Sequence, residues 1–498
     1  SDVYKRQVWN REPEALALAR LALAKVEAGD PSLPRQEALR SLGQACLRCG
    51  LFDESLQHGE AVLALLTGPA RDRYAAELES RRRTMAAARR PDAAERLQPL
   101  ALRIAVLARE VEGPGITFAD DAERFLHEQL LRRIDDLRGL LSTGGMLDGV
   151  RQRLALAESM TARSIEAHRE RWTQRLAAIA TSPHYGGLPL APIVGLVPLG
   201  PDPDSGLEEF VHLASGQGDR AIPTRDANGR LQLEPGNGIV LVLIPGGTTV
   251  LGGQAERADA PRFDPLVGPA EKLREVTLLP FLIGKHEVTQ AQWTRLLSGS
   301  DVRRRPSLYQ AGRTYTGIPG LVTELHPVEN VDQVEAALWL GRAGLALPDE
   351  DQWEYAARGG SASRWWPGDD PAVLAGTANL LDATAAGSGG LANVTNPEPF
   401  ADGYGGTAPV GTFRANAFGL HDVHGNVAEW AAERFANGTA GLERTPARPG
   451  QEHSFGVTRG GSHLSPSGKA RSSARIVESA TLRASYNGLR AAMPLPGR

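Results

Sequence analysis

The sequence GLHDVHGNVAEW, residues 419–430, decides the fold of this 498-residue chain, together with TRGGSHL, residues 458–464. Glycine, aspartate and asparagine punctuate the first stretch, and such residues favour turns. From about Pro235 to the C-terminus the chain is rich in glycine and tryptophan, with short runs between turn signals. We therefore expect the functional half of the chain to begin near Pro235.

Six further blocks accompany these two stretches in order. They are IVLVLIPGGTTVLGG (239–253), FLIGKHEVTQAQW (281–293), HPVENV (326–331), LALPDEDQWEYAARGG (345–360), ANLLD (378–382) and NGLRAA (487–492). The first stretch itself ends a longer block that starts at Asp402. In order and spacing, the eight blocks resemble the sulfatase-modifying-factor domain of the formylglycine-generating-enzyme family. The resemblance covers roughly half of the chain, and eight ordered blocks make it specific.

The resemblance implies an α+β domain with the C-type-lectin-like fold of that family, in which much of the chain is ordered loop. Loop backbone groups need partners outside regular ladders, and bound calcium supplies some of them. Carried over by motif position, a first calcium site would use the Asn379 side chain, the Leu380 carbonyl, the Asp402 carboxylate and the Tyr404 carbonyl.

A second calcium site would use Asp422, the carbonyls of Gly425 and Val427, and Glu429. Both sets contain only oxygen donors, which suit a hard cation in a structural role. The alternative is that these aspartates and asparagines only cap turns.

The family's aerobic enzyme oxidises a substrate cysteine to formylglycine with a thiolate pair that binds copper(I). Alignment through RGGS places this pair at Ser465 and Ala470. Soft thiolates select copper(I), whereas a serine hydroxyl stays protonated near neutral pH and a methyl group has no donor. We therefore expect no copper site and no catalytic residues of the known kind.

A second branch of the family binds non-heme iron through closely spaced histidines and a carboxylate. The helical part of this chain offers only His58, His127, His168 and His184, which are widely separated. No iron site is expected. His463 and Ser465 would share a strand face, but we expect exposed loop residues there rather than a nucleophile and its base.

The favoured interpretation is a non-catalytic domain that recognises a peptide or protein ligand, because the family cleft normally holds an extended peptide. The ligand surface is predicted to be aromatic and polar, with Trp365, Trp366, His463, Ser465, Tyr486 and Asn487. For each aromatic residue, core packing is the alternative.

Two other functions stay open. The first is a formylglycine-generating oxidase, or a related oxidoreductase acting on protein cysteine by an unrecognised route. The second is a diversified lectin-fold binding protein, with a variable loop between His463 and Asn487.

The part before the domain is predicted to be all-α. Residues 8–66 indicate a tetratricopeptide-like hairpin, or a generic helical hairpin, and residues 67–182 a further helical region. Residues 183–234 are dense in proline and glycine, which predicts a linker and a small β segment before the domain of residues 235–498. The chain lacks an initial Met, so we expect an incomplete N-terminus. The arrangement looks similar to that of bacterial signalling proteins in which a serine/threonine kinase precedes helical repeats and this domain. A kinase domain in the missing N-terminal part is therefore a possible partner that the resemblance implies.

Composition excludes several classes of protein. The net charge of -4 gives no basic field for nucleic acid or an anionic membrane. The two cysteines, Cys46 and Cys49, allow no disulfide framework; we expect buried helix residues, with a redox or zinc motif as the alternative. The apolar run 239–244 is too short to span a bilayer and predicts a strand. A cytoplasmic location is expected.

Local signals make further predictions. Thr289 is expected to cap a helix, and Pro348 with Asp349 to start another. Arg459, Arg475 and Arg490 are expected to be buried ion-pair partners rather than catalytic groups.

Overall fold

The computed structural model describes residues 120–141, 146–297, 305–387, 397–435 and 455–495, and the single residues 75, 79 and 118. The predicted hairpin of residues 8–66, with Cys46 and Cys49, lies outside the described residues. Its tetratricopeptide-like character therefore stays a prediction. The chain divides into two compact units, Ser1–Leu137 and Arg138–Arg498.

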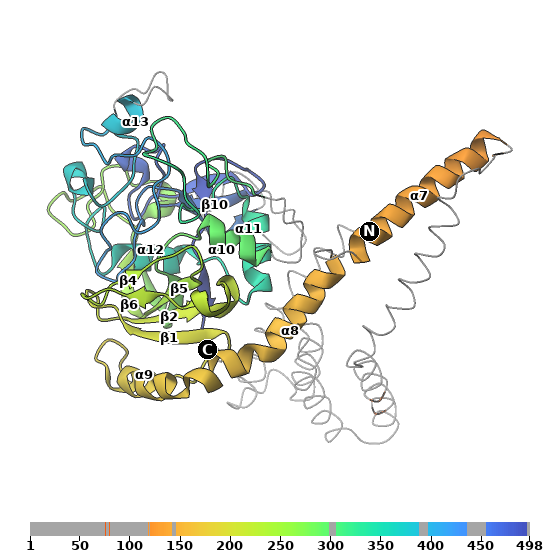
Figure 1. Cartoon of the computed structure of the whole chain (residues 1–498). Coiled ribbons are helices and arrows are strands. Elements are labelled where there is room, and N and C mark those ends of the chain that lie inside the picture. The colour runs from red at the N-terminus through yellow and green to blue at the C-terminus, as the bar shows by residue number, and fades with distance from the viewer. Residues whose placement is uncertain are drawn as a thin grey trace. The chain divides into compact units, whose positions relative to one another are not determined.

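The described residues from Asp121 to Thr181 are almost entirely helical. They form α7 (Asp121–Leu141), α8 (Met146–Ser164), the 3-10 turn η1 (Glu166–His168) and α9 (Arg169–Thr181). Trp172 of α9 is buried, and its Nε1 donates to the Ser164 carbonyl over 2.9 Å. Its ring lies 5.6 Å from that of Phe210, so α9 packs beside β1 and β2 (Figure 1).

The main sheet has five antiparallel strands in the order β1-β2-β5-β8-β13. These are β1 (Leu196–Pro201), β2 (Glu208–His212), β5 (Ile239–Ile244), β8 (Phe281–Gly284) and β13 (Ala492–Pro494). Every residue of β5 is buried, as its continuous apolar sequence predicts. The segment 183–234 thus supplies two strands to the sheet of the domain, rather than only a linker and a separate β segment.

A second sheet carries the two most informative stretches of sequence. Its order is β11-β10-β9-β12, formed by β9 (Ala428–Phe435), β10 (Phe455–Arg459), β11 (Ile476–Ser479) and β12 (Asn487–Gly488). β12 runs parallel to β9, and the other pairs are antiparallel. Two small hairpins complete the strands: β3 (Thr224–Arg225) with β4 (Leu231–Gln232), and β6 (Gly247–Leu251) with β7 (Arg274–Leu278).

Short helices connect the sheets. They are α10 (Gln290–Leu296), α11 (Gln333–Arg342), α12 (Glu350–Arg358) and α13 (Ala383–Gly387). The predicted caps are confirmed, because the Thr289 hydroxyl accepts from the Gln292 amide and the Asp349 carboxylate from the Gln352 amide. Within the described ranges, the remaining 3-10 turns are η2 (Leu213–Ser215), η3 (Gly218–Ala221), η4 (Pro269–Glu271), η5 (Pro371–Leu374) and η7 (Ser467–Lys469).

The domain is α+β, as predicted, with one large core between the main sheet and the helices. That core includes Trp172, Trp293, Trp353 and Trp430. Across the residues that the structure describes, no helix is both long and apolar enough to cross a bilayer.

Candidate functional site

Three segments that are far apart in the sequence meet at the turn of residues 422–427. The Gly425 amide donates to the Gly460 carbonyl over 2.9 Å, and the Asn426 amide donates to the Asn379 carbonyl over 2.8 Å. Gly425 has a φ of 84°, and a Cβ there would lie 2.0 Å from the Asn379 carbonyl oxygen. Only glycine allows both the angle and the close approach. The GLHDVHGNVAEW block therefore joins ANLLD to RGGS.

Ser465 and Ala470, the positions predicted to replace the family's thiol pair, both approach Gly461. A Cβ placed on Gly461 would lie 3.1 Å from the Ala470 Cβ and 3.2 Å from the Ser465 Cβ. The Ser465 hydroxyl accepts from the Ser462 amide over 3.0 Å, and Ala470 packs in a core with Trp365. A protonated hydroxyl and a methyl group do not fit copper(I), which needs soft donors.

The expectation that His463 and Ser465 are exposed loop residues is wrong. His463 is 0% exposed and Ser465 8%. His463 Nδ1 donates to the Asn426 carbonyl over 2.9 Å, and Nε2 has no partner among the described residues. Burial lowers the pKa of His463 to about 4. The Ser465 hydroxyl bonds with Ser462 instead of the imidazole, so the two residues form no nucleophile pair.

The prediction that Trp365 belongs to an exposed ligand surface is wrong. It is buried in a core with Leu374 and Leu380, and its Nε1 donates to the Ser467 carbonyl over 3.1 Å. The alternative of core packing is the correct one for this residue. A large apolar ring is more stable in a core than in water, and its polar atom has found an acceptor.

The other predicted ligand residues are divided between interior and surface. Asn487 is buried and donates to Glu478 over 2.7 Å, and the half-buried Tyr486 donates to the same carboxylate over 3.2 Å. Trp366 is half-buried, with the Arg414 guanidinium 5.9 Å from its ring centroid. Trp366 and Tyr486 thus remain partly accessible, while Asn487 does not.

The residues of the predicted first calcium site come together from two loops. Asp402 accepts from the Leu380 amide over 3.0 Å and from the Tyr404 amide over 2.8 Å. Asn379 is buried; its amide group donates to the Gly406 carbonyl, while its Oδ1 has no partner within the described residues. Burial raises the pKa of Asp402 to about 7. A buried amide oxygen without a donor fits a hard cation.

One side-chain oxygen of the predicted second site has no partner among the described residues. Asp422 Oδ2 accepts from the Gly411 amide over 2.7 Å, whereas Oδ1 is buried without a partner in the described part of the chain. Burial raises the pKa of Asp422 to about 7. Glu429 is engaged differently, because the Trp353 indole and the Arg490 guanidinium both donate to it. Asp422 therefore fits a hard cation better than Glu429 does.

Glu287 lies in the same buried space, although no predicted site included it. It accepts from the Asn426 side chain over 2.6 Å and from the Val427 amide over 2.9 Å. Burial, and then the charges of Asp422 and Glu429, raise the pKa of Glu287 well above its usual range. The sequence did contain a signal for Glu287. An acidic residue stands three positions after the apolar strand FLIG, where solvent is excluded.

The prediction that the three arginines are buried ion-pair partners is confirmed. Arg459 lies 3.0 Å from Glu354, and Arg475 Nη2 donates to Glu350 over 2.7 Å. Arg490 is fully buried beside the Glu429 carboxylate. These arginines hold the loops together and point to no reacting group.

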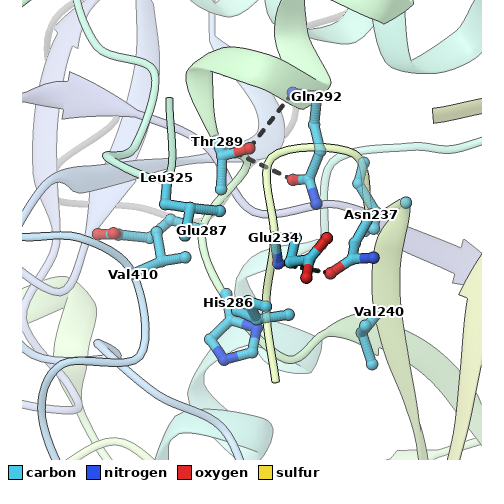
Figure 2. Close-up of a pocket in the computed structure, with 12 residues that line it drawn as sticks. Glu234, Asn237, Val240, His286, Glu287, Thr289, Gln292, Leu325 and Val410 are labelled. Carbon is cyan, nitrogen blue, oxygen red and sulfur yellow. Dashed lines mark hydrogen bonds between the residues drawn. The ribbon is translucent and has the colours of Figure 1, made fainter. Parts of the chain in front are cut away.

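A small cavity borders Glu287 on the side of the main sheet. It has a volume of about 10 Å³, which is room for about one water molecule. Figure 2 shows the side chains that line it, from Glu234, Asn237, Val240, His286, Glu287, Thr289, Gln292, Leu325 and Val410. The cavity is therefore lined by polar as well as apolar side chains.

Comparison with known proteins places this geometry in a family. Residues 232–495, more than half of the chain, match the sulfatase-modifying factor enzyme 1-like domain. The formylglycine-generating enzyme of Thermomonospora curvata is 28% identical over 298 residues, which are 51% of this chain and 92% of that protein. The inactive C-alpha-formylglycine-generating enzyme 2 of Mus musculus is 28% identical over 241 residues, 41% of this chain and 72% of that protein.

A solved structure, that of PvdO from Pseudomonas aeruginosa, is also similar, with 23% identity and a TM-score of 0.39 over 55% of this chain and 98% of PvdO. The family assignment depends on the domain match and on the eight blocks, whose residues form the turn, the sheets and the buried ion pairs described above. Through residues 232–495, the chain belongs to the sulfatase-modifying factor enzyme 1-like domain family.

Proposed function

We propose that this domain recognises a peptide or protein segment without converting it. The observation that carries the proposal is the pair Ser465 and Ala470, whose Cβ atoms both lie near Gly461. Neither residue supplies a thiolate nucleophile or a donor for copper(I). The mouse relative is named as inactive, which agrees with a loss of the reaction in another member of the family.

Backbone hydrogen bonds fix the segment that carries Ser465. The His463 amide donates to the Asn426 carbonyl over 3.0 Å, and the Ser465 amide donates to the Ser462 carbonyl over 2.8 Å. These bonds hold the residues after RGGS against the GLHDVHGNVAEW turn. The partly accessible Trp366 beside this region is the aromatic group that we expect to contact a ligand.

We further propose that calcium ties the loops of the domain together. Asn379, Asp402 and the carbonyls of Leu380 and Tyr404 would hold one ion, and the turn at Asp422 would hold another. The free Oδ1 atoms of Asn379 and Asp422 support both sites, because a buried oxygen without a donor is costly. Each ion would supply positive charge and coordinate loop oxygens.

The absence of turnover is directly testable. The full chain is incubated with copper, oxygen and a sulfatase-type CxPxR peptide, and aldehyde is measured by mass spectrometry. We expect no aldehyde above a metal-free control. A matched Ser465→Cys, Ala470→Cys double variant should gain copper(I) binding, because the two Cβ atoms share one side of Gly461. Turnover by the unaltered protein would overturn the proposal and support the oxidase alternative.

Binding is measured separately with the same peptide carrying a fluorescein label, by anisotropy. We expect the unaltered protein to bind and Trp366→Ala to weaken binding by about tenfold or more. Leu338→Ala is the control, since Leu338 is 43% exposed on α11. No anisotropy change with the unaltered protein would count against this class of peptide ligand, and equal effects of both variants would exclude Trp366 as a contact.

A further inference from the structure

A second small cavity lies beside helix α10 and shares no lining residue with the cavity of Figure 2. Its volume of about 20 Å³ has room for a single water-sized group. Trp293 and Thr294 follow Gln290 by three and four residues, so the three side chains lie on one face of α10. The other lining residues come from the loops around this helix: Arg305, Pro306, Ser307, Ala311, Glu324 and Val328.

The indole of Trp293 brings to this cavity a hydrogen-bond donor without an acceptor. Trp293 is 1% exposed, and its Nε1 has no hydrogen-bond partner among the described residues. The buried indoles of Trp172, Trp365 and Trp430, by contrast, each donate to a backbone carbonyl. A buried donor that has lost water without gaining an acceptor is destabilising. The cavity therefore favours an oxygen atom that comes from outside the described chain.

The other polar groups of the wall leave a second donor for such an oxygen. Ser307 is 3% exposed, and its hydroxyl accepts from the Glu329 amide over 3.3 Å. The proton of that hydroxyl has no acceptor within the described residues. The Gln290 side chain is occupied, because it donates to the Tyr309 carbonyl over 2.7 Å and accepts from the Ala311 amide over 3.1 Å. The wall thus offers an indole and a hydroxyl donor, and a group that enters must be an acceptor.

Arg305 adds a positive charge at the exposed edge of the cavity. Its side chain is exposed and takes part in no ion pair among the described residues. Glu324 also lines the cavity, but its charge acts on Arg295 as well: burial lowers the pKa of Arg295, and Glu324 opposes that shift. A guanidinium binds carboxylate oxygens through charge-assisted hydrogen bonds. The edge of the cavity therefore favours an anion over a neutral acceptor.

We propose that this cavity binds a carboxylate group, with one oxygen on the Trp293 indole and the other beside the Arg305 guanidinium. One arginine balances one carboxylate, whereas a doubly charged phosphate would leave a negative charge beside Glu324. The carboxylate belongs either to a small free acid or to the C-terminus of a peptide, since both present the same chemistry. The site contains no residue of the recognition surface proposed above, so the inference goes beyond that function and does not depend on it.

The first test follows the indole N–H signals of the nitrogen-15-labelled full chain by nuclear magnetic resonance during a titration with sodium acetate. Sodium chloride controls for ionic strength. We expect the Trp293 signal to move, while the signal of Trp430, which donates to the Val331 carbonyl, stays in place. Trp293→Phe assigns the signal by its disappearance. Neutral acetamide keeps a carbonyl oxygen but lacks the charge, and it should bind about tenfold more weakly than acetate or worse.

Calorimetry with acetate measures the contribution of Arg305 without any signal assignment, and it decides the matter if Trp293→Phe does not fold. Arg305→Gln should weaken acetate binding by about tenfold or more. Arg313→Gln is the matched control, because Arg313 is also exposed and close in the sequence but does not line the cavity. It should bind acetate like the unaltered protein. Equal effects of the two variants would overturn the assignment.

Two short acetylated peptides that differ only in a C-terminal acid or amide separate the two sources of the carboxylate. Tighter binding of the acid form than of acetate would assign the site to a peptide end, and binding of acetate alone would assign it to a small free acid. An unmoved Trp293 signal in acetate, or equal shifts with acetate and acetamide, would overturn the proposal and leave the cavity to water. The anisotropy measurement with Trp366→Ala judges peptide recognition separately.

Discussion

At the scale of single residues, Gly425 decides whether the segments of the candidate site can meet. Its φ of 84° and its approach to the Asn379 carbonyl belong to the same turn that presents Asp422 and Val427. An added Cβ would collide with main-chain atoms, which cannot move as the end of a flexible side chain can. The glycine in HGN therefore has a geometric role that is independent of any ligand.

We predict that Gly425→Ala destabilises the protein by more than about 4 kcal/mol or prevents folding. The control is Gly376→Ala, because Gly376 has a φ of 71° but nothing within 4 Å of an added Cβ. The control should cost about 1 to 2 kcal/mol, the penalty of the left-handed backbone alone. Urea unfolding measures both. Equal costs for the two variants would contradict the steric argument.

At the scale of elements, helix α12 joins the second sheet to the β6–β7 hairpin through buried charge. Glu354 is fully buried in the middle of α12 and accepts from the Gly252 amide over 2.7 Å. Burial alone would raise the pKa of Glu354, but Arg358 and Arg459 outweigh it and lower the pKa to about 2. Glu354 therefore keeps its negative charge in the folded protein near neutral pH.

A depressed carboxyl pKa gives stability that is present above the unfolded value and is lost as the pH falls. For Glu354 the free energy of unfolding should decrease between the ordinary pKa of 4.5 and about 2. The loss should be about 3 kcal/mol. Glu354→Gln should lose less stability over this range, although it is less stable near neutral pH because Arg358 keeps no partner carboxylate there.

Urea unfolding at several pH values between 7 and 2 measures this dependence. Glu275→Gln, which removes an exposed glutamate from β7, controls for the loss of one charge. A pH dependence of Glu354→Gln that matches the unaltered protein would show that another carboxylate is responsible.

At the scale of the whole molecule, residues before the matched family range complete the domain. β2 pairs with the fully buried β5, and Lys285 is buried between Asp202 at 2.9 Å and Glu209 at 2.7 Å. Both carboxylates come from the segment predicted as a linker and small β segment. Without that segment, Lys285 would keep a buried charge with no counterion, and β5 would have an open edge.

We predict that a chain starting at Gln232 does not fold cooperatively, whereas a chain starting at Arg138 does. Thermal unfolding followed by circular dichroism compares the two. The unit Arg138–Arg498 contains β1, β2 and both counterions of Lys285. If the shorter chain unfolded at the same temperature as the longer one, the extra strands would be dispensable.

Local chemistry made part of this structure predictable. The cap at Thr289 depends on residues within one turn, and the strand 239–244 on a continuous apolar run, so both followed from the sequence. Burial of the arginines followed from their place in the family blocks. The exposure of His463 and Trp365 was not predictable, because their surroundings come from segments that are distant in the sequence.

The family, the α+β class and the lack of sulfur at positions 465 and 470 follow from residue identity and order alone. The tertiary structure decided which carboxylates have free oxygens, that His463 is buried, and that residues 196–212 belong to the main sheet. Hydrogen-bond saturation and burial arise only when distant segments pack together.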